Sequence, residues 1–369
     1  MSEKIIFTVT NDLVFDRRMH RICSALQQNG FFVELVGRIQ KDSEPVGHFP
    51  FLQTRLKCFF NKGFLFYAEF NIRLFFFLLL NQFDMICSCD LDTLPAGVLA
   101  GKLKRKKRVY DAHEYFPESP ELIGKSFKQS FWHLMEKLLV PNTDAHYTVT
   151  QSIADLFNKK YHTGCKVIRN LPHKCKTAVP MKDTGHPTYL LYQGAVNIGR
   201  GLNEMLLAML KIDGIPFYIA GDGDEMQYVT ASIQKLKLQQ KVKLLGKQTP
   251  DKLKAITEQA YIGINLLENR GLSYYYSLGN KTFDYIQAGI PQILIGFPEY
   301  IELNRQYQIG LIVDELSVEK IETAIRKLLN DRELYGQLHQ NCLKAAAELN
   351  WEKEQPKLLE IYKNLTRNA

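Results

Sequence analysis

The residue types best suited to chemistry gather in residues 279–291, which run Gly-Asn-Lys-Thr-Phe-Asp-Tyr-Ile-Gln-Ala-Gly-Ile-Pro. The stretch is predicted to begin a helix, whose first N–H groups lack partners and whose dipole favours an anion, so that it binds phosphate readily. Lys281 adds a full positive charge, and Asn280 and Asp284 stand four residues apart on one face. Because the Asp284 carboxylate can accept hydrogen bonds from sugar hydroxyls, the stretch predicts a site for a phosphorylated, hydroxylated ligand.

Glycine-containing loops follow three predicted strands in the same half of the chain. They carry Gly194, then Gly221 and Gly223, then Gly246, and the first of them ends in Arg200. Backbone N–H groups of such loops approach phosphate closely, and a guanidinium can fork onto a diphosphate. Two alternatives stay open: Arg200 can be a surface residue at a helix start, and Gly221 and Gly223 can form a plain strand-to-helix turn.

Polar residues also follow two predicted strands of the first half. Residues 111–114, Asp-Ala-His-Glu, come after a strand at residues 108–110. Ligands of open α/β sheets lie beyond the carboxyl ends of the strands, which places His113 and Glu114 at a functional edge. The loop after the first strand, residues 11–18, has no G-x-G-x-x-G, so the nicotinamide-binding fingerprint is absent there.

These motifs resemble those of retaining glycosyltransferases of family 4, in the branch that carries Asn-Lys followed by an acid. Asp284 matches the second of the two acids that are common in the family, and Tyr276 stands where the first is expected. The family commonly has two basic positions in the first glycine loop. Ala195 occupies the first of them here and Arg200 the second. Residues 111–114 are similar to the family's Asp-x-His-Glu.

The resemblance implies an α/β protein of the GT-B type, in which two Rossmann-like domains with parallel sheets face each other across a cleft. Residues 1–172 would be the acceptor-binding domain and residues 173–349 the donor-binding domain, with a last helix at residues 350–369 packing back on the first. The implied reaction moves a sugar, with retention, from a nucleotide-diphospho-sugar to a glycan or lipid-linked acceptor, as a hexosyltransferase in bacterial surface polysaccharide synthesis would. No metal or other cofactor is implied.

The same resemblance implies roles for single residues. Three are implied to be catalytic: His113, Arg200 and Lys281. The donor-binding set is Gly194, Arg200, Gly221, Gly223, Gly246, Asn280, Lys281, Thr282 and Asp284. The acceptor-side set is Asn11, Asp16, Arg17 and Glu114; a capped helix with surface arginines is the alternative for the first three. Two other classes stay open, a catalytically silent GT-B protein that binds a glycan or a partner, and a nucleotide-sugar epimerase of the same architecture.

The elements that must position these residues alternate along the chain. A strand at residues 4–10, a helix at 17–29 and a strand at 31–36 form a β-α-β opening, which predicts a parallel sheet with right-handed crossovers. No regular pattern is evident in residues 37–65. Residues 66–83 form a helix rich in Phe and Leu, which either packs on the sheet or faces a membrane.

Length and composition suit a soluble two-domain protein. The chain has 369 residues, 46% of them hydrophobic and 23% charged. Its 7 cysteines form neither a zinc spacing nor a disulfide framework, and Cys87 and Cys89 are the one close pair among them. Without a visible signal peptide or a run of about 20 apolar residues, we expect a cytoplasmic protein.

A basic run at residues 102–108 contributes to the formal net charge of +8. It is either a solvated helix end or a surface attracted to an anionic membrane or a nucleotide-linked substrate. We therefore expect peripheral contact with the inner membrane face as one option. No nucleic-acid module is recognisable, so a nucleic acid is not expected as a partner.

Overall fold

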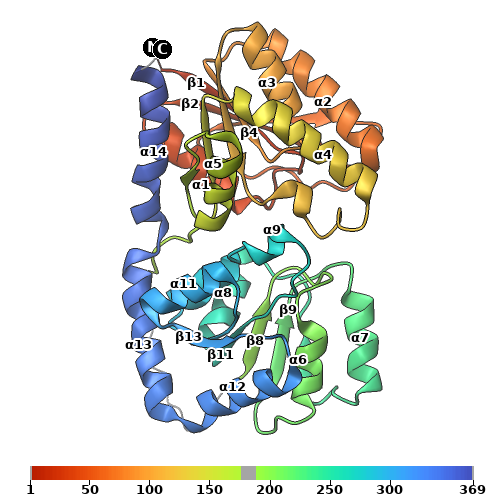
Figure 1. Ribbon diagram of the computed structural model, residues 1–369, viewed down its shortest axis with the longest axis vertical. Coiled ribbons are helices and arrows are strands. Elements are labelled where there is room, and N and C mark those ends of the chain that lie inside the picture. Colours follow the sequence, from red (N-terminus) through yellow and green to blue (C-terminus); the bar gives the residue numbers. More distant parts are fainter. Residues whose placement is uncertain (1, 176–187, 368–369) are drawn as a thin grey trace. The chain divides into compact units, whose positions relative to one another are not determined.

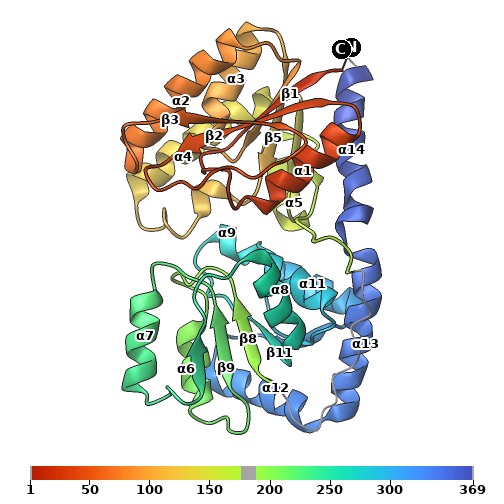
Figure 2. The same cartoon turned by 180° about the vertical axis from the view of Figure 1, so that it is seen from behind.

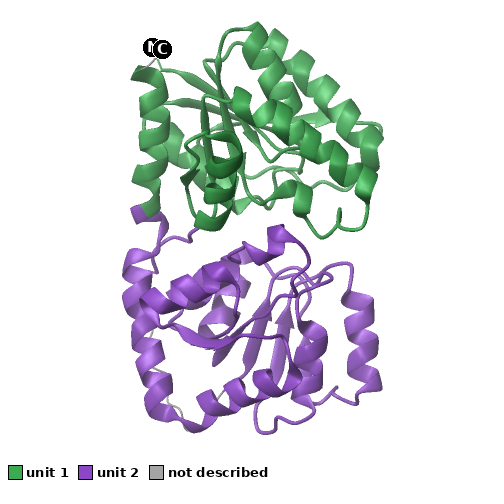
Figure 3. Ribbon diagram, in the orientation of Figure 1, with its two compact units in different colours: residues 1–170, 354–369 green, residues 171–353 purple. Residues whose placement is uncertain are grey.

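The computed structural model describes residues 2–175 and 188–367, and the chain divides into two compact units (Figure 3). Unit 1 comprises residues 1–170 and 354–369, and unit 2 comprises residues 171–353. Residues 176–187, which follow closely on the boundary expected between residues 172 and 173, lie outside the described residues.

Unit 1 is built on a seven-stranded parallel sheet in the order β3-β2-β1-β4-β5-β6-β7. The strands are β1 (Lys4–Thr8), β2 (Phe32–Ile39), β3 (Leu52–Lys57), β4 (Met85–Cys89), β5 (Lys107–Ala112), β6 (Ala145–Thr148) and β7 (Lys166–Val167). The helices are α1 (Arg17–Gln28), α2 (Gly63–Leu80), α3 (Leu94–Leu103), α4 (Ser126–Leu139), α5 (Gln151–Tyr161) and α14 (Trp351–Arg367), with short 3-10 turns η1 (Phe116–Glu118) and η2 (Val140–Asn142). Figures 1 and 2 show α2, α3 and α4 on one face of the sheet and α1 on the other.

Successive side chains of each strand point to opposite faces of this sheet. Ile6 of β1 packs into a core with Phe70 and Leu74 of α2. Its neighbour Phe7 meets Tyr362 of α14, with ring centroids 5.9 Å apart. Tyr362 also pairs its hydroxyl with that of Tyr147 on β6, at 3.1 Å, which ties α14 to unit 1.

Unit 2 is built on a six-stranded parallel sheet in the order β10-β9-β8-β11-β12-β13. The strands are β8 (Leu190–Gln193), β9 (Phe217–Ala220), β10 (Val242–Leu244), β11 (Ile262–Asn265), β12 (Gln292–Ile295) and β13 (Gly310–Val313). The helices are α6 (Leu202–Met209), α7 (Met226–Lys235), α8 (Pro250–Gln259), α9 (Leu272–Tyr275), α10 (Asn280–Gln287), α11 (Pro298–Tyr307), α12 (Val318–Asn330) and α13 (Arg332–Glu348). The two parallel sheets confirm the predicted α/β class.

A glycine allows α10 to lie close to the sheet of unit 2. A Cβ at Gly263 of β11 would meet the ring of Tyr285 at 2.4 Å, so a larger residue would displace the helix. The Tyr285 hydroxyl donates to the carbonyl of Leu191 on β8, at 2.8 Å. These contacts fix α10 across β8 and β11, and its first residues are those singled out in the sequence.

Three elements differ from the expectation. Residues 37–65 contain β3, an edge strand without buried residues, so it lacks the apolar run that marks an inner strand. The helix α11 follows directly after a strand, with Pro298 in its first turn. The loop expected at residues 268–279 contains the short helix α9.

Candidate functional site

The candidate site of unit 2 lies where its strand order reverses. The chain passes from β8 to β9 on one side and from β11 to β12 on the other, so the carboxyl ends of β8 and β11 form the switch point at which α/β sheets bind ligands. Tyr192 and Gln193 end β8, Arg200 lies in the loop that follows, and Lys281 and Asp284 lie on α10. The structure thus brings together the polar residues expected from two distant stretches of sequence.

Two cations at this point rest on aromatic rings. The Nζ atom of Lys281 lies 3.8 Å from the centroid of the Tyr192 ring, and the Cζ atom of Arg200 lies 4.6 Å from that of Tyr274. Lys281 is only 9% exposed, and the Nε atom of Arg200 is buried without a hydrogen-bond partner. Within residues 2–175 and 188–367, neither side chain forms an ion pair. A buried cation without a carboxylate is costly, so the pair is suited to an anionic ligand.

The buried position changes the chemistry expected of Lys281. Burial, and after it the charge of Arg200, lower the pKa of Lys281 well below its usual value. The sequence suggested a full positive charge at this residue, and the structure corrects that expectation for the free protein. A bound phosphate would favour the protonated amine again, because an opposite charge stabilises the charged form.

The N-terminus of α10 is held by hydrogen bonds. Tyr300 accepts from the backbone N–H of Gly279 at 2.9 Å. The Thr282 hydroxyl, fully buried, accepts from the side-chain amide of Asn265. Thr282 therefore positions the helix from inside, whereas the side chain of Asn280 is exposed.

Two successive hydrogen bonds connect Thr257, Gln193 and Asp284. The side-chain amide of Gln193 donates to the Asp284 carboxylate at 2.8 Å, and the Thr257 hydroxyl on α8 donates to the amide oxygen of Gln193 at 2.6 Å. Because an ionised carboxylate only accepts hydrogen bonds, the nitrogen of the Gln193 amide faces Asp284 and its oxygen faces the Thr257 hydroxyl. The sequence analysis missed Gln193 and Thr257; the signal for the first was a polar residue that closes an apolar strand.

The four expected glycines divide into two pairs. Gly194 and Gly246 have positive φ angles of +124° and +66°, and no atom lies within 4 Å of the position a Cβ would take. A Cβ at Gly221 would meet the Gly194 carbonyl oxygen at 1.8 Å, and one at Gly223 would meet the carbonyl oxygen of Val196 at 2.5 Å. Gly221 and Gly223 are therefore required for the packing of the two loops, while Gly194 and Gly246 leave room for a ligand.

Tyr276 occupies the place where the first acid of the pair was expected. Its ring lies 5.4 Å from that of Tyr275, measured between centroids. Glu268, upstream in the same loop, pairs with Arg270 at 2.5 Å. Glu268 therefore does not supply an unpaired carboxylate in place of the acid that Tyr276 replaces.

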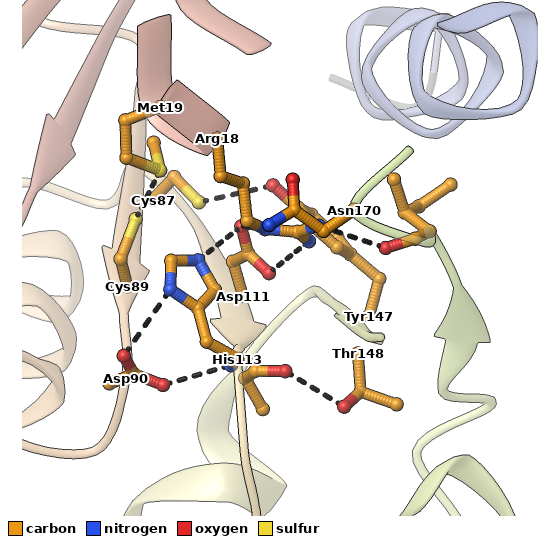
Figure 4. A network of polar contacts seen from close by, with 12 residues as sticks. Arg18, Met19, Cys87, Cys89, Asp90, Asp111, His113, Tyr147, Thr148 and Asn170 are labelled. Atoms are coloured by element: carbon orange, nitrogen blue, oxygen red, sulfur yellow. Dashed lines mark hydrogen bonds and ion pairs between the residues drawn. The ribbon is translucent and has the colours of Figure 1, made fainter. Parts of the chain in front are cut away.

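A second cluster lies at the carboxyl ends of β4 and β5 in unit 1 (Figure 4). The buried carboxylate of Asp111 accepts from Arg18 at 2.8 Å and 3.3 Å, and it lies 3.0 Å from Nε2 of His113. The other ring nitrogen of His113, Nδ1, lies 3.4 Å from Asp90. Asp90 also accepts from the His113 backbone N–H at 2.8 Å. Both ring nitrogens thus face carboxylates, which fix the orientation of the ring.

The two carboxylates decide the charge of this imidazole. Burial alone would lower the pKa of His113, but Asp111 and Asp90 outweigh it and raise the pKa to about 9. Burial alone would raise the pKa of Asp111, but Arg18 and His113 lower it to about 2. Near neutral pH, the cluster therefore holds a cationic His113 beside an ionised Asp111.

In the loop after β1, the residues expected on the acceptor side make contacts that differ from those expected. Asp16 accepts from the backbone N–H of Met19 at 3.0 Å, which caps α1, and from the side-chain amide of Asn11 at 2.7 Å. Arg17 is exposed, and the next residue, Arg18, makes the buried contact with Asp111. The capped-helix alternative thus describes Asp16 and Asn11. Glu114, half-buried, follows His113 directly.

Asp92 is a further buried acid, which follows β4. Its carboxylate accepts from the Thr10 hydroxyl at 2.7 Å, across the ends of β1 and β4, and the cap position of α3 belongs to Thr93. Burial, and then the charge of Asp90, raise the pKa of Asp92 to about 7. Asp92 therefore does not cap α3, and it lies at the switch point of the unit 1 sheet.

Three residues of unit 1 are of types that ligate metals. Atoms of Cys89, Asp111 and His113 lie within 4.8 Å of one another. Both oxygens of Asp111 accept from Arg18, whose positive charge opposes a cation at this position. The Asp111 carboxylate, already engaged by Arg18, is therefore better suited to orienting His113 than to binding a metal ion.

Comparisons with known proteins agree with this architecture. The family model described as glycosyl transferases group 1 matches residues 181–347, and the one described as glycosyltransferase family 4 matches residues 16–171. A search of curated proteins found no match.

Solved structures resemble the chain over nearly its whole length. Sucrose-phosphate synthase from Thermosynechococcus elongatus has a TM-score of 0.81 at 16% identity, with 100% of each chain covered. Anabaena HepE in complex with UDP and glucose has a TM-score of 0.75 at 13% identity, with 98% of this chain and 99% of that chain covered. WaaG, a glycosyltransferase involved in lipopolysaccharide biosynthesis, has a TM-score of 0.71 at 15% identity, with 97% and 99% covered. At these identities the likeness shows the fold, which is GT-B.

Proposed function

Because the chain is a glycosyltransferase of the GT-B type, we propose that it moves a sugar, with retention, from a nucleotide-diphospho-sugar to a glycan or lipid-linked acceptor. The observation that carries the proposal is the pair Lys281 and Arg200, two basic side chains at the switch point of unit 2 that have no carboxylate partner among the described residues. A diphosphate supplies the anion that this pair lacks. Surface polysaccharide assembly in the cytoplasm of a bacterium is the setting that we propose.

The donor would bind unit 2. Its diphosphate would lie against Lys281, Arg200 and the N-terminus of α10, where preorganised positive groups stabilise the charge that develops on the leaving nucleotide. Asp284, fixed by Gln193, would accept from sugar or ribose hydroxyls. Gly194 and Gly246 would let the backbone approach the ligand. This scheme uses protein groups for each contact and calls on no metal ion.

The acceptor would bind unit 1, beyond the carboxyl ends of β1, β4 and β5. Asn11 and Glu114 border this edge, and His113, which follows β5, contacts Asp90, which follows β4. The cationic His113 would favour a ligand with negative charge or with hydroxyl oxygens nearby. Retention by front-face attack is the reaction course that we propose for transfer.

The direct test is turnover of labelled sugars linked to UDP, GDP and ADP by the purified protein. We expect slow release of one nucleotide without an acceptor, and faster release with a glycan acceptor whose product keeps the donor's anomeric configuration by NMR. UDP-glucose is the first donor to try, since UDP and glucose occur together in the HepE structure. Interconversion of sugars without an acceptor would indicate an epimerase instead. No turnover of any donor would indicate a silent binding protein.

A further inference from the structure

The helix α2 exposes an apolar face to solvent. Its residues Phe66, Phe70, Leu74 and Leu78 are buried in the core of unit 1. On the opposite side, Leu65, Ile72 and Phe76 are 56%, 58% and 57% exposed. A helix on the surface of a soluble protein normally presents polar residues there, and a helix that is apolar all round is normally covered. By length and composition α2 could cross a membrane, but its packing against the sheet makes it a core helix with an uncovered outer face.

The neighbouring helix α4 repeats this pattern. Phe127, Leu134 and Leu138 have the same spacing as the exposed residues of α2, and they are 86%, 50% and 53% exposed. The two helices contact each other, because the rings of Phe64 and Phe131 have centroids 5.8 Å apart. Figure 1 shows both helices on the same face of the unit 1 sheet. We call the exposed apolar residues of α2 and α4 the α2–α4 surface.

The loop before α2 adds two aromatic rings to this surface. Phe59 is 80% exposed and Phe60 is 47% exposed. Their backbone N–H groups donate to the carboxylate of Glu69, each with a contact at 2.9 Å, and Arg73 pairs with the same carboxylate at 2.7 Å. The single acid on the outer part of α2 is thus neutralised locally, and its hydrogen bonds hold the loop that carries both rings.

The exposed charges within residues 59–80 and 125–139, which carry the α2–α4 surface, are mostly positive. Exposed cations stand at Lys62 before α2, at Lys125 and Lys128 on either side of Phe127, and at Lys137 on α4. In residues 59–80 and 125–139 the only acids are Glu69, paired with Arg73, and Glu136, which is fully buried.

The basic run at residues 102–108 adds less free positive charge to the protein surface than its sequence suggested. Lys104 donates to backbone carbonyls at the end of α2, including that of Leu79 at 3.1 Å. Lys106 pairs with Asp84 and Arg108 with Asp144, each at 2.9 Å. Lys104, Lys106 and Arg108 therefore join elements of unit 1 and do not form a free basic patch.

We propose that the α2–α4 surface docks on a bilayer that contains anionic lipids. The exposed Phe and Leu side chains would enter the boundary between headgroups and acyl chains, while the lysines would contact the lipid phosphates, as in interfacial amphipathic helices. A neutral protein partner would leave the excess of lysines without a counterpart. The proposal is independent of the donor site, since it concerns unit 1 and the donor residues belong to unit 2.

Co-sedimentation with vesicles tests the proposal. The full chain should bind vesicles of phosphatidylcholine with phosphatidylglycerol, bind neutral phosphatidylcholine at least about tenfold more weakly, and lose affinity as salt rises. The double variant I72E/F127E should reduce binding by a further factor of about ten or more. The control L210E/I301E changes two apolar residues of unit 2, 45% and 47% exposed, and should bind as the wild type does. Thermal unfolding checks that each variant is folded.

Two outcomes would overturn the proposal. One is binding of I72E/F127E to anionic vesicles that equals that of the wild type. The other is a dimer, seen by sedimentation velocity and abolished by I72E/F127E, together with no vesicle binding, which would make the surface an interface between two copies. Nucleotide binding measured on the same variants keeps this result separate from the proposed activity, because neither substitution touches unit 2.

Discussion

The amine nitrogen of Lys281 lies 3.8 Å from the centroid of the Tyr192 ring, at the switch point of the unit 2 sheet. An aromatic face stabilises a cation only in part, and no carboxylate completes the contact within the described residues. Lys281 is therefore expected to lower the stability of the free protein and to favour binding of an anion.

Replacing Lys281 by Met should therefore act in opposite directions on activity and stability. Transferase turnover should fall by a factor of about 10² or more, because a group that stabilises the leaving diphosphate is lost. The free energy of unfolding should stay the same or rise by about 1 kcal/mol, because a buried amine is replaced by an apolar chain of similar length. Urea unfolding and a nucleotide-release assay measure the two effects. As a control, Lys243→Met removes an exposed cation 5.6 Å from the Tyr218 ring and should change neither.

Binding of a nucleoside diphosphate should take up a proton. The pKa of Lys281 is lowered by burial and by Arg200, and a bound phosphate raises it again. Between the two pKa values the free protein is deprotonated and the complex protonated, so affinity should fall as pH rises through that interval. Calorimetric titrations in buffers of different ionisation enthalpy count the protons. A count that is unchanged in Lys281→Met would show that another group titrates.

The His113 cluster should make stability depend on pH. The pKa of His113 is about 9 in the folded protein, against 6.5 for an unperturbed histidine. The folded state thus binds the proton more tightly, so its contribution is complete below pH 6.5 and is lost as pH rises through about 9.

Urea unfolding at several pH values across this interval measures the contribution. We expect the wild type to lose roughly 1–3 kcal/mol, and His113→Gln to lack this slope. The control His173→Gln removes an exposed ring that pairs with Glu352 at 2.9 Å, and it should keep the slope. An equal slope in His113→Gln and the wild type would contradict the assignment.

Gln193 should matter for the nucleoside rather than for the phosphates. Gln193→Leu removes the amide that orients Asp284 and leaves the Thr257 hydroxyl without its acceptor on β8. We expect affinity for the nucleoside and for its diphosphate to fall together, by a factor of about ten. Thr257→Val, which removes the hydroxyl bonded to Gln193, should lower both affinities as well. Its matched control is Thr230→Val, which removes a hydroxyl bonded to Met226 within α7 and should change neither affinity. Unequal losses for nucleoside and diphosphate would argue against this role.

Regular periodicity and strand-end chemistry made much of this architecture predictable. Apolar periodicity located β1, α1 and β2 close to their observed bounds, and the glycine-containing loops marked the ends of β8, β9 and β10. The edge strand β3 escaped prediction because none of its residues is buried, so its sequence has no apolar run. Burial patterns that depend on distant elements cannot be read from a short stretch.

Contacts between residues far apart in the chain could not be predicted from the sequence. Arg18 and Arg17 are indistinguishable by type, and only the helix geometry turns Arg18 toward Asp111. Lys281 was expected to be charged, but its pKa is lowered first by burial and then by Arg200 in another loop. Tyr192 and Gln193 looked like ordinary strand residues until the fold placed α10 beside them.

The central claim is that Lys281 and Arg200 bind the diphosphate of the donor. Its most direct test compares the affinities of UDP with uridine, GDP with guanosine and ADP with adenosine by calorimetric titration, in the wild type and in K281M/R200M. The account predicts that one diphosphate binds the wild type at least about 10² times more tightly than its nucleoside, and that the double variant binds the two almost equally. A ratio that is the same in both proteins would contradict it.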